Sequence, residues 1–271
     1  MTQMKLKFPS LSRRADEVVR SPPRVPEGQR IYAIGDIHGR ADLLRSLFDH
    51  MVDDLKRFPI DDTLCIFLGD YVDRGPDSQA VLELLTALAS PTRFISLRGN
   101  HEMLLLSFLN NPSDADVWRA NGGLETLHSY GVNISAFRSG RGLEKVAKQF
   151  RAALPSSHLD FLRQTRLSIS VGDYFFCHAG VRPGTPLDTQ RQEDVAWIRD
   201  EFLLSEAYHG KVVVHGHTSV LTPEVKHNRI NIDTGAYISE CLTALVLEGE
   251  TQRFLSTRPG GAAMDDIDDR T

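Results

Sequence analysis

The chain has 271 residues, 41% of them hydrophobic, which is enough for one globular domain with a substantial core and too little to expect a second full domain. Its net charge of -5 argues against DNA as a partner, because phosphate backbones are bound by clustered Lys and Arg side chains. No apolar stretch approaches the ~20 residues of a membrane span, and residues 1–28 lack the apolar centre of a secretory signal. We therefore expect a cytoplasmic protein with no membrane partner.

Proline and glycine positions divide the chain into three parts. Ser21-Pro22-Pro23 and Pro26 break regular structure and predict an irregular N-terminal arm over residues 1–29. One folded domain is expected over residues 30–256. Gly260-Gly261 and the aspartates after it predict a loose acidic tail over residues 257–271.

The first part of the domain repeats one pattern three times: a short apolar strand, a polar loop and a helix with apolar residues at helical spacing. The strands are predicted at 31–34, 64–68 and 93–97, and the helices at 41–58, 76–88 and 103–109. A spacing of roughly 30 residues is the length of one βαβ unit. The strands should therefore lie parallel, with all three loops at the sheet edge where α/β proteins bind ligands.

The interval between His101 and His178 is too long for a structureless loop and predicts helices at 117–130 and 143–154. Asn121-Gly122-Gly123 interrupts the first of them, either to shape the rim of a substrate site or as a plain turn. The second half predicts short strands of a second, mixed sheet at 167–171, 174–177, 212–214, 230–232 and 242–247. The three cysteines lie inside apolar runs and are expected to be buried thiols: Cys65, Cys177 and Cys241.

Polar clusters rich in metal-ligand side chains follow five of these strands. They are Gly35 to Gly39, Gly69 to Gly75, Gly99 to Glu102, Cys177 to Gly180 and Gly216 to Thr218. Carboxylate, amide and imidazole groups bind Mn²⁺, Fe and Zn²⁺, and a set this large suits two ions held close together. Any single cluster would more often be a hydrogen-bonded turn. Their convergence at strand ends predicts a two-metal phosphoesterase site.

Each cluster suggests a position around the two ions. Asp36 and His38 stand on alternate residues and suit the first metal, while the two oxygens of Asp70 allow it to bridge both ions. The set for the second metal is completed by Asn100, His178 and His217. Paired metals lower the pKa of bound water, so we expect a hydroxide nucleophile and no covalent enzyme intermediate.

Further residues suggest the remaining parts of a phosphoesterase. His101 should point away from the metals and protonate the departing oxygen, with Asp73 orienting its other ring nitrogen. Arg74 and Arg199 suit phosphate oxygens, because a guanidinium fork matches phosphate geometry. The segment Asp233-Thr234-Gly235-Ala236-Tyr237 either lines the site or forms a simple turn.

The first three clusters match the signatures of the phosphoprotein phosphatase family of Ser/Thr phosphatases, within the calcineurin-like metallophosphoesterases. From Ile31 to about Leu247 the chain resembles the small bacterial and lambda-phage-like members. The resemblance implies a four-layer α/β/β/α sandwich, two metals, often Mn²⁺, and hydrolysis of phosphoserine or phosphothreonine in proteins and peptides. By position it gives the first metal Asp36, His38 and Asp70, and the second Asp70, Asn100, His178 and His217. It also implies His101 with Asp73 as the acid pair, and Arg74 and Arg199 as phosphate ligands.

The chain departs from the eukaryotic members of that family in the loop after the last ligand histidine. Asp233 to Tyr237 stands where those members carry Ser-Ala-Pro-Asn-Tyr-Cys, so regulatory subunits are not expected. Bacterial relatives often accept phosphotyrosine and small phosphoesters, so the preference for Ser/Thr stays open.

Two other functions compete with the phosphatase interpretation. Symmetrical diadenosine tetraphosphate hydrolases resemble the chain, but usually have Ala where Asp73 stands and Asp where Glu102 stands. Both residues favour the phosphatase. An inactive metal-binding interaction module would usually have lost a ligand or the acid, whereas every position is filled here.

Overall fold

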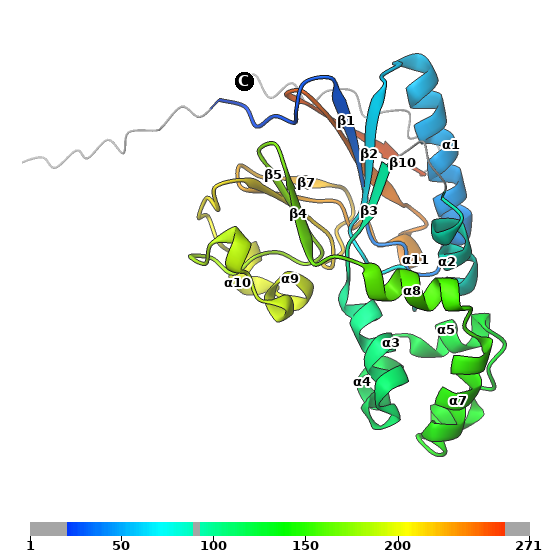
Figure 1. Cartoon of the computed structure of the whole chain (residues 1–271). Coiled ribbons are helices and arrows are strands. Elements are labelled where there is room, and N and C mark those ends of the chain that lie inside the picture. Colours follow the sequence, from blue (N-terminus) through cyan, green and yellow to red (C-terminus); the bar gives the residue numbers. More distant parts are fainter. Residues whose placement is uncertain (1–20, 89–92, 258–271) are drawn as a thin grey trace, which may run out of the picture.

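Alternating apolar residues build two facing five-stranded sheets in the computed structural model, which describes residues 21–88 and 93–257 (Figure 1). The strand order is β10-β9-β1-β2-β3 in the first sheet and β4-β5-β6-β8-β7 in the second. The first sheet contains β1 (Gln29–Ile34), β2 (Asp62–Phe67), β3 (Arg93–Ser96), β9 (Thr243–Glu248) and β10 (Thr251–Ser256). The second contains β4 (Ser168–Val171), β5 (Tyr174–Cys177), β6 (Val212–His215), β7 (Glu224–Val225) and β8 (Arg229–Asn231).

The three strand–loop–helix units have the predicted arrangement. β1 pairs parallel with β2, and β2 pairs parallel with β3, so the loops after these strands meet at one sheet edge. In the second sheet, β5 and β6 are also parallel. Five polar loops therefore leave the carboxyl ends of parallel strands in two facing sheets.

Strand residues on opposite faces fill separate cores, which gives the molecule four layers. Ile31 of β1 packs with Phe176 of β5 in the core between the sheets. Its neighbour Tyr32 points to the other face, into the core that contains residues of α1 (Ala41–Arg57) and α2 (Ser78–Thr86). Across the molecule, Phe175 packs in a third core with residues of α9 (Gln192–Trp197) and α10 (Asp200–Leu203), among them Phe202 of α10. The α/β/β/α sandwich implied by the resemblance is confirmed.

The helical prediction between the two halves is confirmed in outline, including the interruption at Asn121-Gly122-Gly123. α3 (Asn100–Asn110) begins at Asn100, earlier than predicted, because Glu102 caps the amide of Gly99. The helix expected over 117–130 is divided at Gly122, whose φ of 99° is left-handed. The segment contains η1 (Pro112–Asp114), α4 (Ala115–Ala120), α5 (Gly123–Ser129), α6 (Ser135–Ser139), α7 (Leu143–Ala153) and α8 (Ser156–Gln164). These helices gather at one end of the sandwich (Figure 1).

The outer regions of the chain complete the domain. Residues 21–28 lack regular structure, but Val25 is buried and its amide donates to the carbonyl of Gly249. The rest of the predicted arm and tail, residues 1–20 and 258–271, lie outside the described residues. Two short elements, η2 (Leu187–Thr189) and α11 (Ala236–Ser239), connect strands of the second half. Within the described ranges, no helix is both long and apolar enough to cross a membrane.

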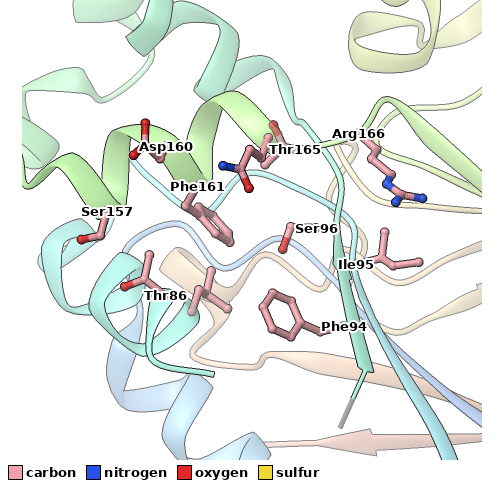
Figure 2. A pocket seen from close by; sticks show the side chains of 11 residues that line it. Thr86, Phe94, Ile95, Ser96, Ser157, Asp160, Phe161, Thr165 and Arg166 are labelled. Atoms are coloured by element: carbon pink, nitrogen blue, oxygen red, sulfur yellow. The ribbon is translucent and has the colours of Figure 1, made fainter. Parts of the chain in front are cut away.

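A hollow of about 360 Å³ lies between α2, β3 and α8 (Figure 2). Phe94 and Phe161 give it apolar walls, and Ser96, Asp160 and Arg166 contribute polar groups. None of the predicted site residues lines it. The chemistry of the five loops is therefore assembled elsewhere.

Candidate metal centre

The six predicted metal ligands lie at the strand ends and are buried, none more than 6% exposed. Asp36 and His38 follow β1, Asp70 follows β2, and Asn100 opens α3 just after β3. The second sheet supplies the other two residues, His178 after β5 and His217 after β6. Loops from both sheets thus converge on one centre, as the strand pattern predicts.

Side-chain atoms that could hold metal ions form two groups that share Asp70. In one group, atoms of His38, Asp70 and His101 lie within 4.8 Å of one another, and in the other so do atoms of Asp70, His178 and His217. The Oδ2 atom of Asp70 lies 3.5 Å from His38 Nε2 and 3.3 Å from His178 Nε2. Asp70 belongs to both groups, which is the arrangement expected of a bridging carboxylate.

Asn100 and Asp36 adjoin these groups. Asn100 Oδ1 lies 3.0 Å from His178 Nε2. Asp36 Oδ2 accepts a hydrogen bond from the amide of His217, while its Oδ1 is buried without a hydrogen-bond partner. Among the described residues, Nε2 of His217 is likewise buried without a hydrogen-bond partner. Buried donor atoms of this kind, drawn from Asp, Asn and His, fit a pair of first-row divalent metals.

Charge in the centre is balanced between carboxylates and imidazoles. Burial opposes the charged form of His178, but Asp70 and Asp36 outweigh it and raise its pKa to about 10. Burial lowers the pKa of His38 to about 3 and that of His217 to about 2. His178, His101 and His38 together overcome the burial of Asp70 and hold its pKa well below the ordinary value. Divalent cations can replace the compensating protons, because metal ligands must be deprotonated.

The backbone at the centre adopts a conformation that side chains rarely tolerate. Among non-glycine residues of the described ranges, six have positive φ, and all but Glu240 belong to the predicted site. These five are His38, Asp70, Asp73, Arg74 and His217. Left-handed residues cost free energy and persist where surrounding structure enforces them. All five lie in the loops after β1, β2 and β6, which carry predicted metal ligands.

Two cluster glycines leave room for the ligand carboxylates. A Cβ atom on Gly99 would lie 2.0 Å from Oδ1 of Asp70, and one on Gly216 would lie 2.1 Å from Oδ1 of Asp36. Neither position tolerates a side chain without moving a ligand. The lack of space for a Cβ atom therefore explains why glycine occupies both positions, more directly than a need for loop flexibility does.

Glu102 supports the loop that carries Asp70. Its carboxylate accepts hydrogen bonds from the amides of Gly99, Asp70 and Tyr71 at 2.8 to 2.9 Å. Burial, and then the charge of Asp70, raise the pKa of Glu102 to about 7. In the sequence, Glu102 served only to distinguish phosphatases from dinucleotide hydrolases. The structure shows that it binds three backbone amides around Asp70.

His101 and Asp73 form the predicted pair. His101 Nδ1 lies 2.7 Å from Asp73 Oδ2, and both side chains are fully buried. The expectation that His101 points away from the metals is wrong, because its Nε2 lies 3.8 Å from Asp70 Oδ2. Burial opposes the charged imidazolium, but Asp70 and Asp73 raise the pKa of His101 above its ordinary value.

The two arginines approach the centre from different segments, Arg74 from the loop after β2 and Arg199 from the junction of α9 and α10. Arg74 Nη1 lies 3.2 Å from His38 Nε2, and its guanidinium lies 5.0 Å from the ring centroid of Tyr237. Arg199, which is exposed, donates to the hydroxyl of Thr218 at 3.2 Å. Both are therefore adjacent to metal-ligand positions, as a phosphate-binding role requires.

The segment after β8 both forms a turn and lines the site. Asp233 accepts hydrogen bonds from the Gly235 amide and the Ser219 hydroxyl, which form the turn. Tyr237 nevertheless reaches the centre, with its ring 5.3 Å from that of His38. Trp197, whose role the sequence did not suggest, lies 6.2 Å from the His217 ring.

Comparisons with known proteins agree with this geometry. The family model for calcineurin-like phosphoesterases matches residues 29–240. The asymmetrical bis(5'-nucleosyl)-tetraphosphatase PrpE of Halalkalibacterium halodurans is 28% identical over 233 residues, covering 78% of this chain and 87% of the relative. Serine/threonine-protein phosphatase 2 of Salmonella typhimurium is 29% identical over 223 residues, covering 78% of this chain and 89% of the relative.

A solved structure gives the same fold. The cold-active protein-tyrosine phosphatase of a Shewanella species aligns with a TM-score of 0.55 at 17% identity, covering 89% of this chain and 82% of the other. The two named relatives differ in substrate, but the family model spans the second sheet, strands β1 to β3 of the first sheet and all six ligand positions. The chain accordingly belongs to the calcineurin-like phosphoesterases and is a metal-dependent hydrolase of phosphoesters.

Proposed function

We propose that this chain is a protein serine/threonine phosphatase that also accepts phosphotyrosine. The observation that carries the proposal is the buried contact of 2.7 Å between His101 and Asp73. A serine or threonine alkoxide is a strongly basic leaving group that must be protonated as the ester bond breaks. A nucleotide phosphate leaves as a stable anion and has less need of an acid. A buried acid pair thus favours alkyl phosphomonoesters.

The surrounding residues suit a phosphomonoester. When bound, two divalent ions supply water activation and charge neutralisation, and Mn²⁺ is our first choice, with Fe or Zn²⁺ as alternatives. Arg74 and Arg199 bind the outer phosphate oxygens from two sides. His101 then lies beside the leaving oxygen, with Asp73 holding its ring.

A specific observation favours the second candidate, a dinucleoside tetraphosphate hydrolase. Trp197 is 36% exposed and adjoins His217, where an aromatic ring can stack on a nucleobase. The relative from Halalkalibacterium halodurans carries that activity in its name, in the asymmetrical form, whereas the sequence pointed to the symmetrical form. An inactive module is disfavoured because such a protein would usually have lost a ligand or the acid, and the sequence retains a suitable residue at each of these positions.

Kinetics on matched substrates test the proposal. We expect Mn²⁺-dependent hydrolysis of phosphoserine and phosphothreonine peptides with kcat/KM above that for phosphotyrosine peptides and for diadenosine tetraphosphate. His101→Asn should bind both metals yet lose about 100- to 10,000-fold in kcat on phosphoserine peptides. Full turnover by that variant, or a preference for diadenosine tetraphosphate, would overturn the proposal. We also propose that the protein acts in the cytoplasm and without regulatory subunits.

A further inference from the structure

The carboxylate of Asp73 has donors besides His101. Trp118 Nε1 lies 3.0 Å from its Oδ1 and 2.9 Å from its Oδ2, and the Thr126 hydroxyl donates to Oδ1 at 2.6 Å. The side chains of Asp73 and His101 are fully buried, and Trp118 and Thr126 have no exposed surface. The orientation of Asp73 is thus determined by three side chains, of which only His101 faces the reaction.

The two additional donors come from the helical segment between the halves of the sandwich. Trp118 lies in α4 and Thr126 in α5, at 45 and 53 positions from Asp73 (Figure 1). The left-handed Gly122 joins the two helices, and its carbonyl accepts from the amide of Arg74. Thr126 Oγ1 also accepts from the amide of Asp73. This segment therefore fixes both the backbone and the carboxylate of Asp73.

The indole nitrogen of Trp118 is not required for packing. Its ring lies among aromatic side chains, with centroids 4.9 Å from Phe108, 5.4 Å from Phe137 and 5.9 Å from Phe150. A phenylalanine would fill much of this apolar space. The polar Nε1 atom has Asp73 as its acceptor, and burying such a donor is favourable only because that acceptor is there.

We propose that Trp118 and Thr126 are positioning residues for proton donation by His101. They hold the Asp73 carboxylate so that it accepts from Nδ1 of His101, which leaves Nε2 to carry the transferred proton. A hydroxide oxygen bonds to phosphorus while the proton passes from Nε2 to the ester oxygen and the bond between phosphorus and that oxygen breaks, which releases phosphate and the alcohol. The inference rests on the proposed function, because it assumes that His101 is the acid.

The test compares substrates with different needs for an acid. p-Nitrophenolate is a good leaving group and a serine alkoxide is a poor one, so a misplaced acid should matter only for the second. Trp118→Phe should lower kcat on a phosphoserine peptide about 10-fold, and leave kcat on p-nitrophenyl phosphate within about twofold. Thr126→Val should likewise lower kcat on the phosphoserine peptide more than on p-nitrophenyl phosphate. Thr126→Ser keeps the hydroxyl and should retain the activity of the parent protein.

Phe108→Leu is the matched control for packing. It disturbs the same aromatic cluster without touching Asp73, so it should lower the unfolding temperature but not change the ratio of the two activities. In a His101→Asn background, Trp118→Phe should have no additional effect, because the two changes then act on one step. Equal losses on both substrates, or a further loss in that background, would show that Trp118 has only a structural role.

A spectroscopic measurement tests the contact without turnover. In the metal-free protein, the proton shared by His101 Nδ1 and Asp73 should give a downfield proton resonance that Trp118→Phe shifts and Phe108→Leu leaves in place. An unmoved resonance in Trp118→Phe contradicts the inference. If His101→Asn keeps full activity, the proposed function fails; if that variant is impaired but Trp118→Phe is not, only the inference about Trp118 fails.

Discussion

The backbone amide of His217 donates a hydrogen bond of 3.0 Å to the Asp36 carboxylate, although the two residues are 181 positions apart. Asp36 follows a strand of the first sheet, and His217 follows a strand of the second. A predicted ligand of one metal is thereby oriented by the loop that supplies a ligand of the other. The centre is complete only when both halves of the chain have folded.

Replacing Gly216 should break this connection. The added Cβ of Gly216→Ala would lie 2.1 Å from Asp36 Oδ1, so the carboxylate or the loop must move. We expect unchanged helix and strand content by circular dichroism, loss of bound metal by elemental analysis, and a fall in kcat/KM of about 100-fold or more. Gly131→Ala is the control, because its φ of 69° causes strain but its Cβ would meet no atom within 4 Å. Normal metal content in Gly216→Ala would contradict the role assigned to Asp36.

Metal binding should stabilise the fold measurably. Burial first, and then the charge of Asp233, raise the pKa of Asp36, so bringing the carboxylates together costs free energy without a cation. A chelator should abolish turnover and lower the unfolding temperature, and Mn²⁺ should restore both. A ligand at 100 times its Kd adds about 2.7 kcal/mol of stability, which calorimetry can resolve. Asp70→Asn should reduce the shift, and no shift with any divalent ion would argue against a resident metal pair.

The contact between Tyr237 and Arg74 predicts an effect on substrate binding. The guanidinium lies 5.0 Å from the ring centroid, a cation–π contact that holds Arg74 beside His38. Tyr237→Leu should raise KM for phosphopeptides about threefold with a smaller change in kcat, since Arg74 loses its platform. Tyr237→Phe keeps the ring and should behave like the parent protein in the same steady-state assay. Equal effects of the two substitutions would point to the hydroxyl instead.

The sequence predicts those parts of the molecule that depend on local pattern. Apolar runs followed by glycine and aspartate place β1 and β2 and the ligands after them, because strand ends and turn residues are encoded within a few positions. Contacts between residues far apart in the sequence have no such local pattern. Nothing near Trp118 indicates that its indole reaches Asp73, and β10 is a partly buried hairpin partner of β9 without a long apolar run.

A second buried cluster of charged residues lies away from the metal centre, around Asp54. It leads to a prediction about the stability of the fold. Asp54 of α1 is 4% exposed; it lies 3.2 Å from Arg30 Nη1 and 2.8 Å from Arg253 Nη1, and accepts from the Tyr32 hydroxyl at 2.6 Å. Breaking a buried ion pair leaves the opposite charge uncompensated and costs about 3 kcal/mol or more. Asp54→Asn should lower the free energy of unfolding by that amount in urea titrations at neutral pH.

The pH dependence of the same variant follows from the direction of the shift. Burial by itself would raise the pKa of Asp54, but hydrogen bonds from Arg253 and Tyr32 and the charges of the two arginines lower it. The resulting stability is fully present above the unfolded-state pKa of about 3.9, and is lost as pH falls through the lower pKa of the folded state. As the pH is lowered, the free energy of unfolding of Asp54→Asn should therefore fall less steeply than that of the parent protein. Asp53→Asn removes an exposed pair with Lys56 and should change stability by less than about 1 kcal/mol. If the two variants unfold at the same urea concentration, the Asp54 cluster does not stabilise the fold.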